Sequence, residues 1–216
     1  MQDQHADIQW RDDGVPVSTR FDDPYFSIHD GLAETNHVFL DGNNLLSRFD
    51  GPLHIAELGF GTGLNFLATW AAWDAAGHHA PLHFTSFEAF PMAPDQQAQA
   101  LAAFPAVSTY AKRLLAGDTG DLKLTLIKGD ARDTLPLWQG RADAWFLDGF
   151  SPAKNPEMWA ADVMQGVGDH TAPGGTVATY TAAGHVRRAL ETAGLTVSRI
   201  PGFGRKRHMT RAVKED

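Results

Sequence analysis

The feature that most constrains this chain is the alternation of short apolar runs with segments of helical periodicity, which begins near residue 53 and continues to the end. Several apolar runs are hydrophobic on consecutive residues, as in Ala144–Leu147, a pattern typical of parallel strands buried on both faces. Strands that alternate with helices indicate a doubly wound α/β sheet. The sequence therefore predicts a Rossmann-like, mostly parallel sheet covered by helices.

The expected sheet has seven strands, and its last strand is antiparallel. The predicted strands are Leu53–Leu58, Leu82–Phe87, Leu122–Ile127, Ala142–Leu147, Gly175–Tyr180, Leu195–Ile200 and His208–Val213. The predicted helices are Leu64–Ala76, Ala93–Ala103, Val107–Ala116, Pro156–Val167 and Ala182–Ala193. Only Pro201–Arg207 joins the last two strands, which is too short for a right-handed crossover through a helix. We therefore expect these two strands to pair antiparallel at one edge.

The length and the first 50 residues indicate how the chain is organised. A chain of 216 residues is of ordinary size for one structural domain. Residues 1–50 are rich in Asp, Gly and Asn with scattered aromatic residues, unlike the alternating pattern that follows. We expect them to form an N-terminal extension folded over one end of the sheet, packed on a catalytic domain of residues 51–216.

The composition excludes several classes of protein. No segment approaches the roughly 20 apolar residues that a membrane span requires, and residues 1–13 are polar and acidic, unlike a secretory signal. The absence of cysteine excludes disulfides and thiolate metal sites, and it fits a reducing compartment. We therefore expect a cytoplasmic protein without a membrane partner, and nothing in the sequence indicates an obligate protein partner.

The charge is unevenly distributed along the chain. Residues 185–216 carry eight Lys or Arg against three acids, whereas the whole chain has a formal net charge of −8. An acidic body argues against a general nucleic-acid binder, but a basic tail suits contact with a phosphate backbone. The other interpretation is a solvated terminal strand and helix face, and charge alone leaves both open.

A glycine-rich loop follows the first predicted strand, within Glu57–Gly63. In doubly wound sheets, ligands bind outside the carboxyl ends of the strands, and glycines there let a ligand approach the backbone at a helix N-terminus. The spacing GxGxG, with an acid two residues before it, departs from the GxGxxG of dinucleotide sites, and that acid is suited to a cationic ammonium. A tight turn without a ligand is the alternative. The candidate cofactor residues here are Glu57, Gly59, Gly61, Thr62 and Gly63.

Acids also follow the second and third predicted strands. Glu88 is placed to accept hydrogen bonds from both hydroxyls of a ribose. In Gly129-Asp130-Ala131, Asp130 is suited to accept a hydrogen bond from an adenine amino group, and Ala131 lies beside it. Asp130 is equally suited to cap the helical turn that follows, and the two roles are compatible.

The fourth predicted strand ends in Asp148-Gly149-Phe150-Ser151-Pro152, where we expect the chemistry. Methyl transfer from a sulfonium requires a neutral nucleophile held in line about 3 Å from the methyl carbon, so positioning dominates. Asp148 is placed to contact the cofactor, to orient an amine and to remove its proton, and Phe150 to stack on a planar base. The alternative for Asp148 is a structural cap of the turn. No spacing such as HExxH occurs, so we expect no metal.

The sequence resembles one particular family. The segments that carry the resemblance are Phe21–Ser27, Gly31–Leu40, Gly42-Asn43, Glu57–Phe66, Phe146–Pro156 and Gly202–Arg207. They cover nearly the whole chain from about Pro16 onward. The chain is similar to the methyltransferase domain of the bacterial bifunctional tRNA wobble-uridine enzymes called MnmC, and to their stand-alone relatives called MnmD. The glycine loop is common to many methyltransferases, whereas the N-terminal block and the stretch from Asp148 to Trp159 are more particular.

The resemblance implies a class I S-adenosylmethionine-dependent methyltransferase. It would methylate the exocyclic amine of 5-aminomethyl-2-thiouridine at the wobble position of tRNA, giving 5-methylaminomethyl-2-thiouridine. The family roles fall on Gly59, Gly61, Glu88 and Asp130 for the cofactor and on Asp148 beside the amine. Bifunctional relatives continue into a flavin-dependent domain, so we expect this chain, which ends at Asp216, to bind no FAD. The candidate contacts to tRNA are Lys154, Arg205, Lys206 and Arg207.

Three alternatives remain from the sequence. A small-molecule N-methyltransferase or an aminopropyltransferase would share the fold and the acidic strand ends. A nicotinamide-dependent oxidoreductase would use a similar sheet, but the loop lacks GxGxxG and no catalytic Tyr-Lys pair is evident. A non-catalytic binding module ranks last, because acids follow all four of the strands considered.

Overall fold

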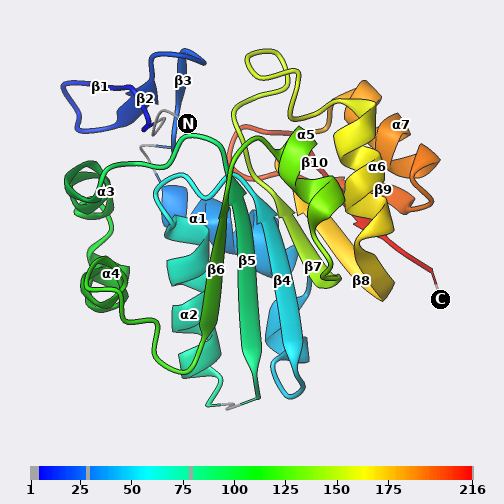
Figure 1. Cartoon of the computed structure of the whole chain (residues 1–216), viewed down its shortest axis with the longest axis horizontal. Coiled ribbons are helices and arrows are strands. Elements are labelled where there is room, and N and C mark those ends of the chain that lie inside the picture. The colour runs from blue at the N-terminus through cyan, green and yellow to red at the C-terminus, as the bar shows by residue number, and fades with distance from the viewer. Residues whose placement is uncertain (1–4, 28–29, 78–79, 216) are drawn as a thin grey trace.

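The main sheet has the predicted topology. The computed structural model describes residues 5–27, 30–77 and 80–215. Its seven-stranded sheet has the order β6-β5-β4-β7-β8-β10-β9 (Figure 1). The strands are β4 (Leu53–Leu58), β5 (Leu82–Glu88), β6 (Lys123–Lys128), β7 (Ala142–Leu147), β8 (Thr171–Thr179), β9 (Thr196–Pro201) and β10 (His208–Val213). The strands from β6 to β8 pair in parallel, and β10 is antiparallel to both β8 and β9. The predicted mostly parallel sheet with an antiparallel last strand is confirmed.

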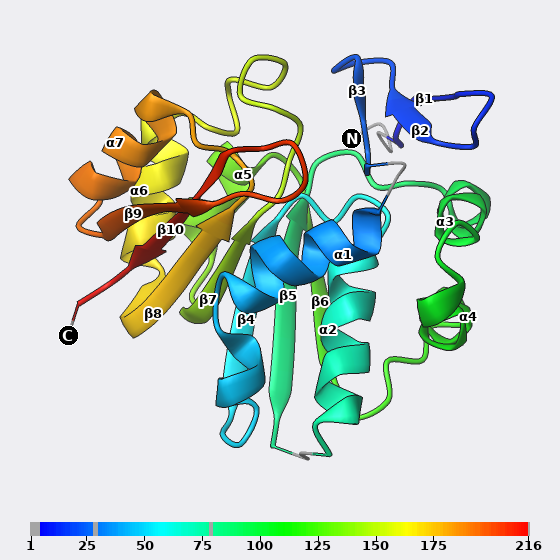
Figure 2. The same cartoon turned by 180° about the vertical axis from the view of Figure 1, so that it is seen from behind.

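Helices cover both faces of this sheet, as the two opposite views show (Figures 1 and 2). The helices are α1 (Gly31–Thr35), α2 (Leu64–Ala75), α3 (Pro94–Leu101), α4 (Ser108–Leu115), α5 (Ala131–Thr134), α6 (Ala161–Asp169) and α7 (Gly184–Thr192). The helices α1 and α2 lie on one face, and α5, α6 and α7 lie on the other. Short 3₁₀ turns at Pro105–Val107 and Leu135–Leu137 complete the connections. None of the helices in the described part of the chain is long and apolar enough to cross a membrane.

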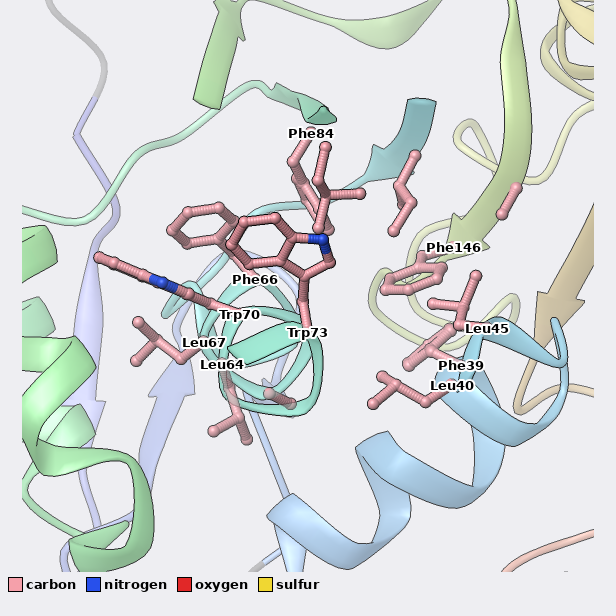
Figure 3. Packing of buried hydrophobic residues seen from close by; sticks show 14 of the residues in the cluster. Phe39, Leu40, Leu45, Leu64, Phe66, Leu67, Trp70, Trp73, Phe84 and Phe146 are labelled. Carbon is pink, nitrogen blue, oxygen red and sulfur yellow. The ribbon is translucent and has the colours of Figure 1, made fainter. Parts of the chain in front are cut away.

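The central strand β7 explains the run of consecutive apolar residues. Ala144 and Phe146 belong to the hydrophobic cluster on the α2 face, whereas Trp145 and Leu147 belong to the cluster on the α6 face. All four side chains have no exposed surface. Figure 3 shows Phe146 with aromatic side chains of the α2 face, including Phe66 and Trp70 of α2. Because alternate residues point to opposite faces, a strand covered on both sides is apolar throughout.

The N-terminal 50 residues divide between two locations. The strands β1 (Ile8–Trp10), β2 (Pro16–Ser18) and β3 (Asp23–Pro24) form a small antiparallel sheet near the carboxyl end of the main sheet (Figure 1). After α1, a π-helical turn η1 (Asn36–Asp41) and a 3₁₀ turn η2 (Leu45–Arg48) pack on a face of the main sheet, where Phe39 stacks on Phe146 at 5.1 Å. This segment contributes to the main core through five almost fully buried side chains, those of Val38, Phe39, Leu40, Leu45 and Phe49.

Two elements begin four or more residues away from the predicted position. The helix α6 begins at Ala161 instead of Pro156, because residues 156–159 form turns that bring Trp159 Nε1 to the carbonyl oxygen of Phe150 at 2.8 Å. The strand β8 begins at Thr171, four residues earlier than predicted, across an irregular register with β7. Both differences depend on contacts between segments, which local patterns do not contain.

Candidate active site

A cavity of about 1220 Å³ lies at the carboxyl ends of the central strands. Its walls include residues 59–62 after β4, 88–90 after β5, 129–132 after β6 and 148–151 after β7, together with parts of the N-terminal sheet and of the β9–β10 loop. Eleven of the predicted site residues line it: Gly59, Gly61, Thr62, Glu88, Asp130, Ala131, Asp148, Phe150, Lys154, Arg205 and Lys206. Glu57, Gly63 and Arg207 are not among its lining residues.

The glycine loop brings the ends of β4 and β7 into contact. A Cβ atom on Gly59, which has a φ of +88°, would lie 2.1 Å from the carbonyl oxygen of Asp148. A side chain there would therefore push Asp148 away. Gly63 has a structural position instead: it precedes α2 with a φ of +83°, and an added Cβ would lie 2.9 Å from the Phe60 ring.

Glu88 is held by backbone N–H groups at the end of β5. Gly61 N donates to Oε2 at 2.9 Å, and Phe90 N donates to Oε1 at 2.8 Å. Burial raises the pKa of Glu88, and these backbone N–H groups oppose that rise because they stabilise the charged form. Each carboxylate oxygen has a second lone pair, so Glu88 retains the capacity to accept two further hydrogen bonds from a ligand.

Asp130 caps the short helix α5, as the sequence allowed. Its Oδ1 accepts a hydrogen bond from Arg132 N at 2.9 Å, and its Oδ2 forms an ion pair with Arg132 Nη2 at 2.7 Å. The Arg132 side chain holds the pKa of Asp130 below its usual value. The cap orients this carboxylate at the rim of the cavity, beside Ala131.

Asp148 is held by a side-chain amide instead of the backbone. Asn65 Nδ2 donates to Asp148 Oδ2 at 2.7 Å and also to Glu57 Oε1 at 2.9 Å. Burial raises the pKa of Asp148 to about 6, and the Asn65 hydrogen bond opposes that rise. A carboxylate with this pKa is mostly ionised at pH 7 and is well matched to accept a proton.

Glu57 lies behind Asp148 and away from the cavity. Its side chain has no exposed surface, and Ser86 Oγ donates to Oε2 at 2.6 Å. Burial raises the pKa of Glu57 to about 8, so the neutral acid predominates at pH 7. The direct contact with a cationic ammonium that we expected for Glu57 finds no support in this geometry.

The N-terminal sheet is fastened to the loop after β7. Phe21 stacks on Phe150 with ring centroids 4.8 Å apart, and Asp23 Oδ2 accepts a hydrogen bond from Ser151 N at 2.8 Å. Lys154, which we predicted to contact phosphate, forms an exposed ion pair with Asp22. The aromatic ring expected to stack on a base therefore already contacts Phe21 on one face.

Sequence reasoning missed three further polar residues around Asp148. Besides Asn65, these are Glu34 on α1 and Tyr180 after β8, both of which line the cavity. Lys206 Nζ donates to Glu34 Oε1 at 2.7 Å and lies 4.2 Å from the centroid of the Tyr180 ring. Asn65 and Glu34 lie in segments that carry the family resemblance, but only the fold reveals their contacts.

The residues of the cavity suit S-adenosylmethionine. Three carboxylates, Glu88, Asp130 and Asp148, face a ligand whose sulfonium and ammonium groups are cationic, and aromatic faces such as those of Tyr25 and Phe150 favour the same charge. Gly59 and Gly61 have positive φ angles, which favour glycine. Because glycine has no side chain, a ligand can approach the backbone at this part of the cavity wall. Within the described residues, no group of three His, Cys, Asp or Glu side chains is arranged to hold a metal ion.

The doubly wound fold and a cavity suited to S-adenosylmethionine are typical of S-adenosylmethionine-dependent methyltransferases, and a family comparison agrees. Residues 93–215 match the model of a family described as S-adenosyl-L-methionine-dependent methyltransferases. The chain belongs to this family. A precorrin-6y C5,15-methyltransferase from Geobacter metallireducens shares the fold, with a TM-score of 0.56 at 14% identity over 96% of this chain and 100% of that one.

More particular relatives carry the name tRNA 5-methylaminomethyl-2-thiouridine biosynthesis bifunctional protein MnmC. That of Ectopseudomonas mendocina is 46% identical over 97% of this chain, and that of Marinobacter nauticus is 46% identical over 94%. The chain spans 35% and 36% of their lengths. The crystal structure of MNMC2 from Aquifex aeolicus superposes with a TM-score of 0.77 at 26% identity, over 98% of this chain and 71% of that one.

Proposed function

We propose that this chain transfers a methyl group from S-adenosylmethionine to the exocyclic amine of 5-aminomethyl-2-thiouridine at the wobble position of tRNA. The product would be 5-methylaminomethyl-2-thiouridine. The observation that carries the proposal is the 44–46% identity to MnmC proteins along 94–97% of this chain. The Asp148 carboxylate at the cavity supports it, since an amine acceptor must lose a proton.

The cofactor would occupy the part of the cavity next to the carboxyl ends of β4, β5 and β6. Gly59, Gly61 and Thr62 would let it approach the backbone, Glu88 would accept hydrogen bonds from the ribose hydroxyls, and Asp130 with Ala131 would contact the adenine. Bound S-adenosylmethionine supplies an electrophilic methyl group on a sulfonium. The carboxylates around it would balance the cationic charge of the bound molecule.

Asp148 would act on the substrate amine. A free alkylamine is mainly an ammonium at neutral pH, so the ionised Asp148 would first bind it and then accept a proton, directly or through water. Asp148 would also hold the nitrogen in line with the methyl group, where orientation lowers the barrier most. Phe150, which packs against Phe21 and Tyr25, would contact the base as an aromatic surface.

The tRNA would approach over the basic side of the cavity. Arg205 and Lys206 line it from the β9–β10 loop, and Arg207 follows them. Lys206 and Lys154 are paired with Glu34 and Asp22, so each would have to exchange its partner for a phosphate. Few phosphate contacts on an acidic protein imply weak binding that decreases with salt. With tRNA as its substrate, this activity would be cytoplasmic.

Mass spectrometry of wobble nucleosides tests the proposal. Purified chain is incubated with methyl-labelled S-adenosylmethionine and tRNA that carries 5-aminomethyl-2-thiouridine, and the nucleosides are then resolved. We expect the label in 5-methylaminomethyl-2-thiouridine. Label that enters only added small amines, with unmodified tRNA, would instead establish a small-molecule methyltransferase. Tight binding of NADH without binding of S-adenosylmethionine would reject both.

A further inference from the structure

The side chain of Asn65, in the first turn of α2, uses all its hydrogen-bonding atoms inside the protein. Its Nδ2 donates one hydrogen bond to Glu57 Oε1 at 2.9 Å and a second to Asp148 Oδ2 at 2.7 Å. Its Oδ1 accepts a hydrogen bond from Thr35 Oγ1 at 2.9 Å. Asn65 is buried. The amide is therefore fixed in one orientation between two carboxyl groups.

The buried side chain of Glu57 on β4 holds the Asn65 amide from the interior of the protein. Ser86 Oγ on the neighbouring strand holds the other oxygen of Glu57 at 2.6 Å, so a chain of hydrogen bonds runs from β5 through β4 and α2 to the end of β7. Because the neutral form of Glu57 predominates at pH 7, it holds Asn65 without placing a full second negative charge next to Asp148.

The opposite oxygen of Asp148 is available for chemistry. No described residue donates a hydrogen bond to Asp148 Oδ1, whereas Oδ2 is occupied by Asn65. We propose that Asn65 is a positioning residue for methyl transfer, which fixes Asp148 Oδ2 and directs Oδ1 toward the acceptor amine, with Glu57 as its buried support. This inference rests on the proposed function only for the identity of the amine.

Other charged and titratable groups near Asp148 compensate one another. Glu34 on α1 raises the pKa of Asp148 and Lys206 in the β9–β10 loop lowers it, but these two side chains are paired with each other at 2.7 Å. Tyr180 after β8 donates to the carbonyl oxygen of Gly149 at 2.7 Å and keeps its proton, because burial raises its pKa well above the usual value. Glu57 is mostly neutral. The Asn65 amide is thus the main uncompensated contact that favours ionised Asp148.

The variant Asn65→Leu tests this role, because leucine has nearly the same size and lacks both N–H donors. The first readout is the pKa of Asp148 from carbon NMR of its carboxyl group, in protein without cofactor or substrate, assigned with Asp148→Asn. We expect the pKa to rise by about one pH unit, since a charge-assisted hydrogen bond is lost. The second readout is the pH profile of single-turnover methyl transfer. Its acidic limb should move upward with the pKa, and the rate at pH 7 should fall about tenfold or more.

Thr69→Val is the matched control. Thr69 lies one turn further along α2, is buried, and donates only to the backbone oxygen of Asn65 at 2.8 Å. We expect it to change stability but neither the pKa of Asp148 nor the position of the acidic limb. A shift as large as that of Asn65→Leu would assign the effect to general damage of α2 and overturn the proposal.

If Asn65→Leu does not fold, Thr35→Val replaces it, because it leaves Asn65 in place but removes the hydroxyl that orients the amide. We expect a rise of about half a pH unit in the pKa of Asp148. An unchanged pKa in the folded variant would overturn the role of Asn65. The NMR titration needs no substrate, so its result stands even if the wild-type chain methylates no tRNA nucleoside, which would reject the proposed function alone.

Discussion

The cavity has two corners whose acids are held in different ways. At the ends of β5 and β6, Glu88 and Asp130 accept hydrogen bonds from backbone N–H groups, those of Gly61 and Phe90 for Glu88 and that of Arg132 for Asp130. At the ends of β4 and β7, Asp148 at the cavity and the buried Glu57 behind it share the side-chain amide of Asn65. Phe90 N and Arg132 N belong to the local turns, Gly61 N lies 27 positions from Glu88, and the Asn65 amide lies 83 positions from Asp148.

The different surroundings of these acids suggest two roles, cofactor binding at the ends of β5 and β6 and proton transfer at the end of β7. Arg132 lowers the pKa of Asp130, and at Glu88, where burial raises the pKa, the backbone N–H groups oppose that rise by stabilising the charged form. Burial raises the pKa of Asp148 to about 6, close enough to neutrality for it to gain and lose a proton during turnover. We infer that the β5–β6 corner holds the cofactor and that the β4–β7 corner acts on the amine.

The largest effect is expected for Asp148→Asn. The amide keeps the size of the side chain but accepts no proton from an ammonium, so single-turnover methyl transfer should slow by about 10²- to 10⁴-fold. The affinity for S-adenosylmethionine, measured by calorimetry, should change by less than about threefold, since the β5–β6 corner is intact. Asp121→Asn, at an exposed aspartate, is the control. A wild-type rate in Asp148→Asn would remove this carboxylate from the mechanism.

The next effect concerns the pH dependence of stability. The pKa of Glu57 is about 8 in the folded chain against an ordinary value of 4.5, so the unfolded chain loses this proton at lower pH than the folded chain. The free energy of unfolding should therefore fall between about pH 4.5 and pH 8. In Glu57→Gln this contribution is absent, and the variant should gain roughly 3 kcal/mol relative to wild type between pH 5 and pH 8.

Urea unfolding of both proteins at pH 5 and pH 8 measures the difference. Asp148 also has a raised pKa and lowers stability over the acidic part of the same range, but it does so in both proteins and cancels from the comparison. Parallel pH dependences in wild type and Glu57→Gln would mean that Glu57 is ionised in the folded chain, and that the two corners do not differ as described.

Glu88→Ala should have a smaller effect, confined to cofactor binding. Loss of the hydrogen bonds expected from the ribose should weaken binding of S-adenosylmethionine by roughly 1 to 3 kcal/mol. The same variant should leave the pKa of Asp148 close to its wild-type value. Calorimetry of the wild type, Glu88→Ala and the exposed variant Glu191→Ala gives the comparison. Unchanged affinity in Glu88→Ala would refute the ribose assignment.

The same distinction explains what the sequence could and could not predict. Glu88, Asp130 and Asp148 were predicted because each follows an apolar strand, and the carboxyl ends of parallel strands meet at one edge of a sheet. The Asn65 bridge, the Phe21–Phe150 stack and the burial of Val38–Leu40, Leu45 and Phe49 in the main core were not predicted. Each of these depends on which distant segments the fold brings together, and a single sequence contains no local pattern for that.

The smallest effect is expected at Asp130, and it tests whether the β5–β6 corner depends on hydrogen bonding or on charge. Asn is as good an N-cap as Asp, so Asp130→Asn should keep the hydrogen bond from Arg132 N and unfold within about 0.5 kcal/mol of wild type. Asp130→Ala loses the cap and should be about 1 kcal/mol less stable in urea unfolding. The ion pair with Arg132 is partly exposed and should add little. Equal destabilisation by both variants would assign the effect to the charge of Asp130, and the hydrogen bond from the local turn would then contribute little.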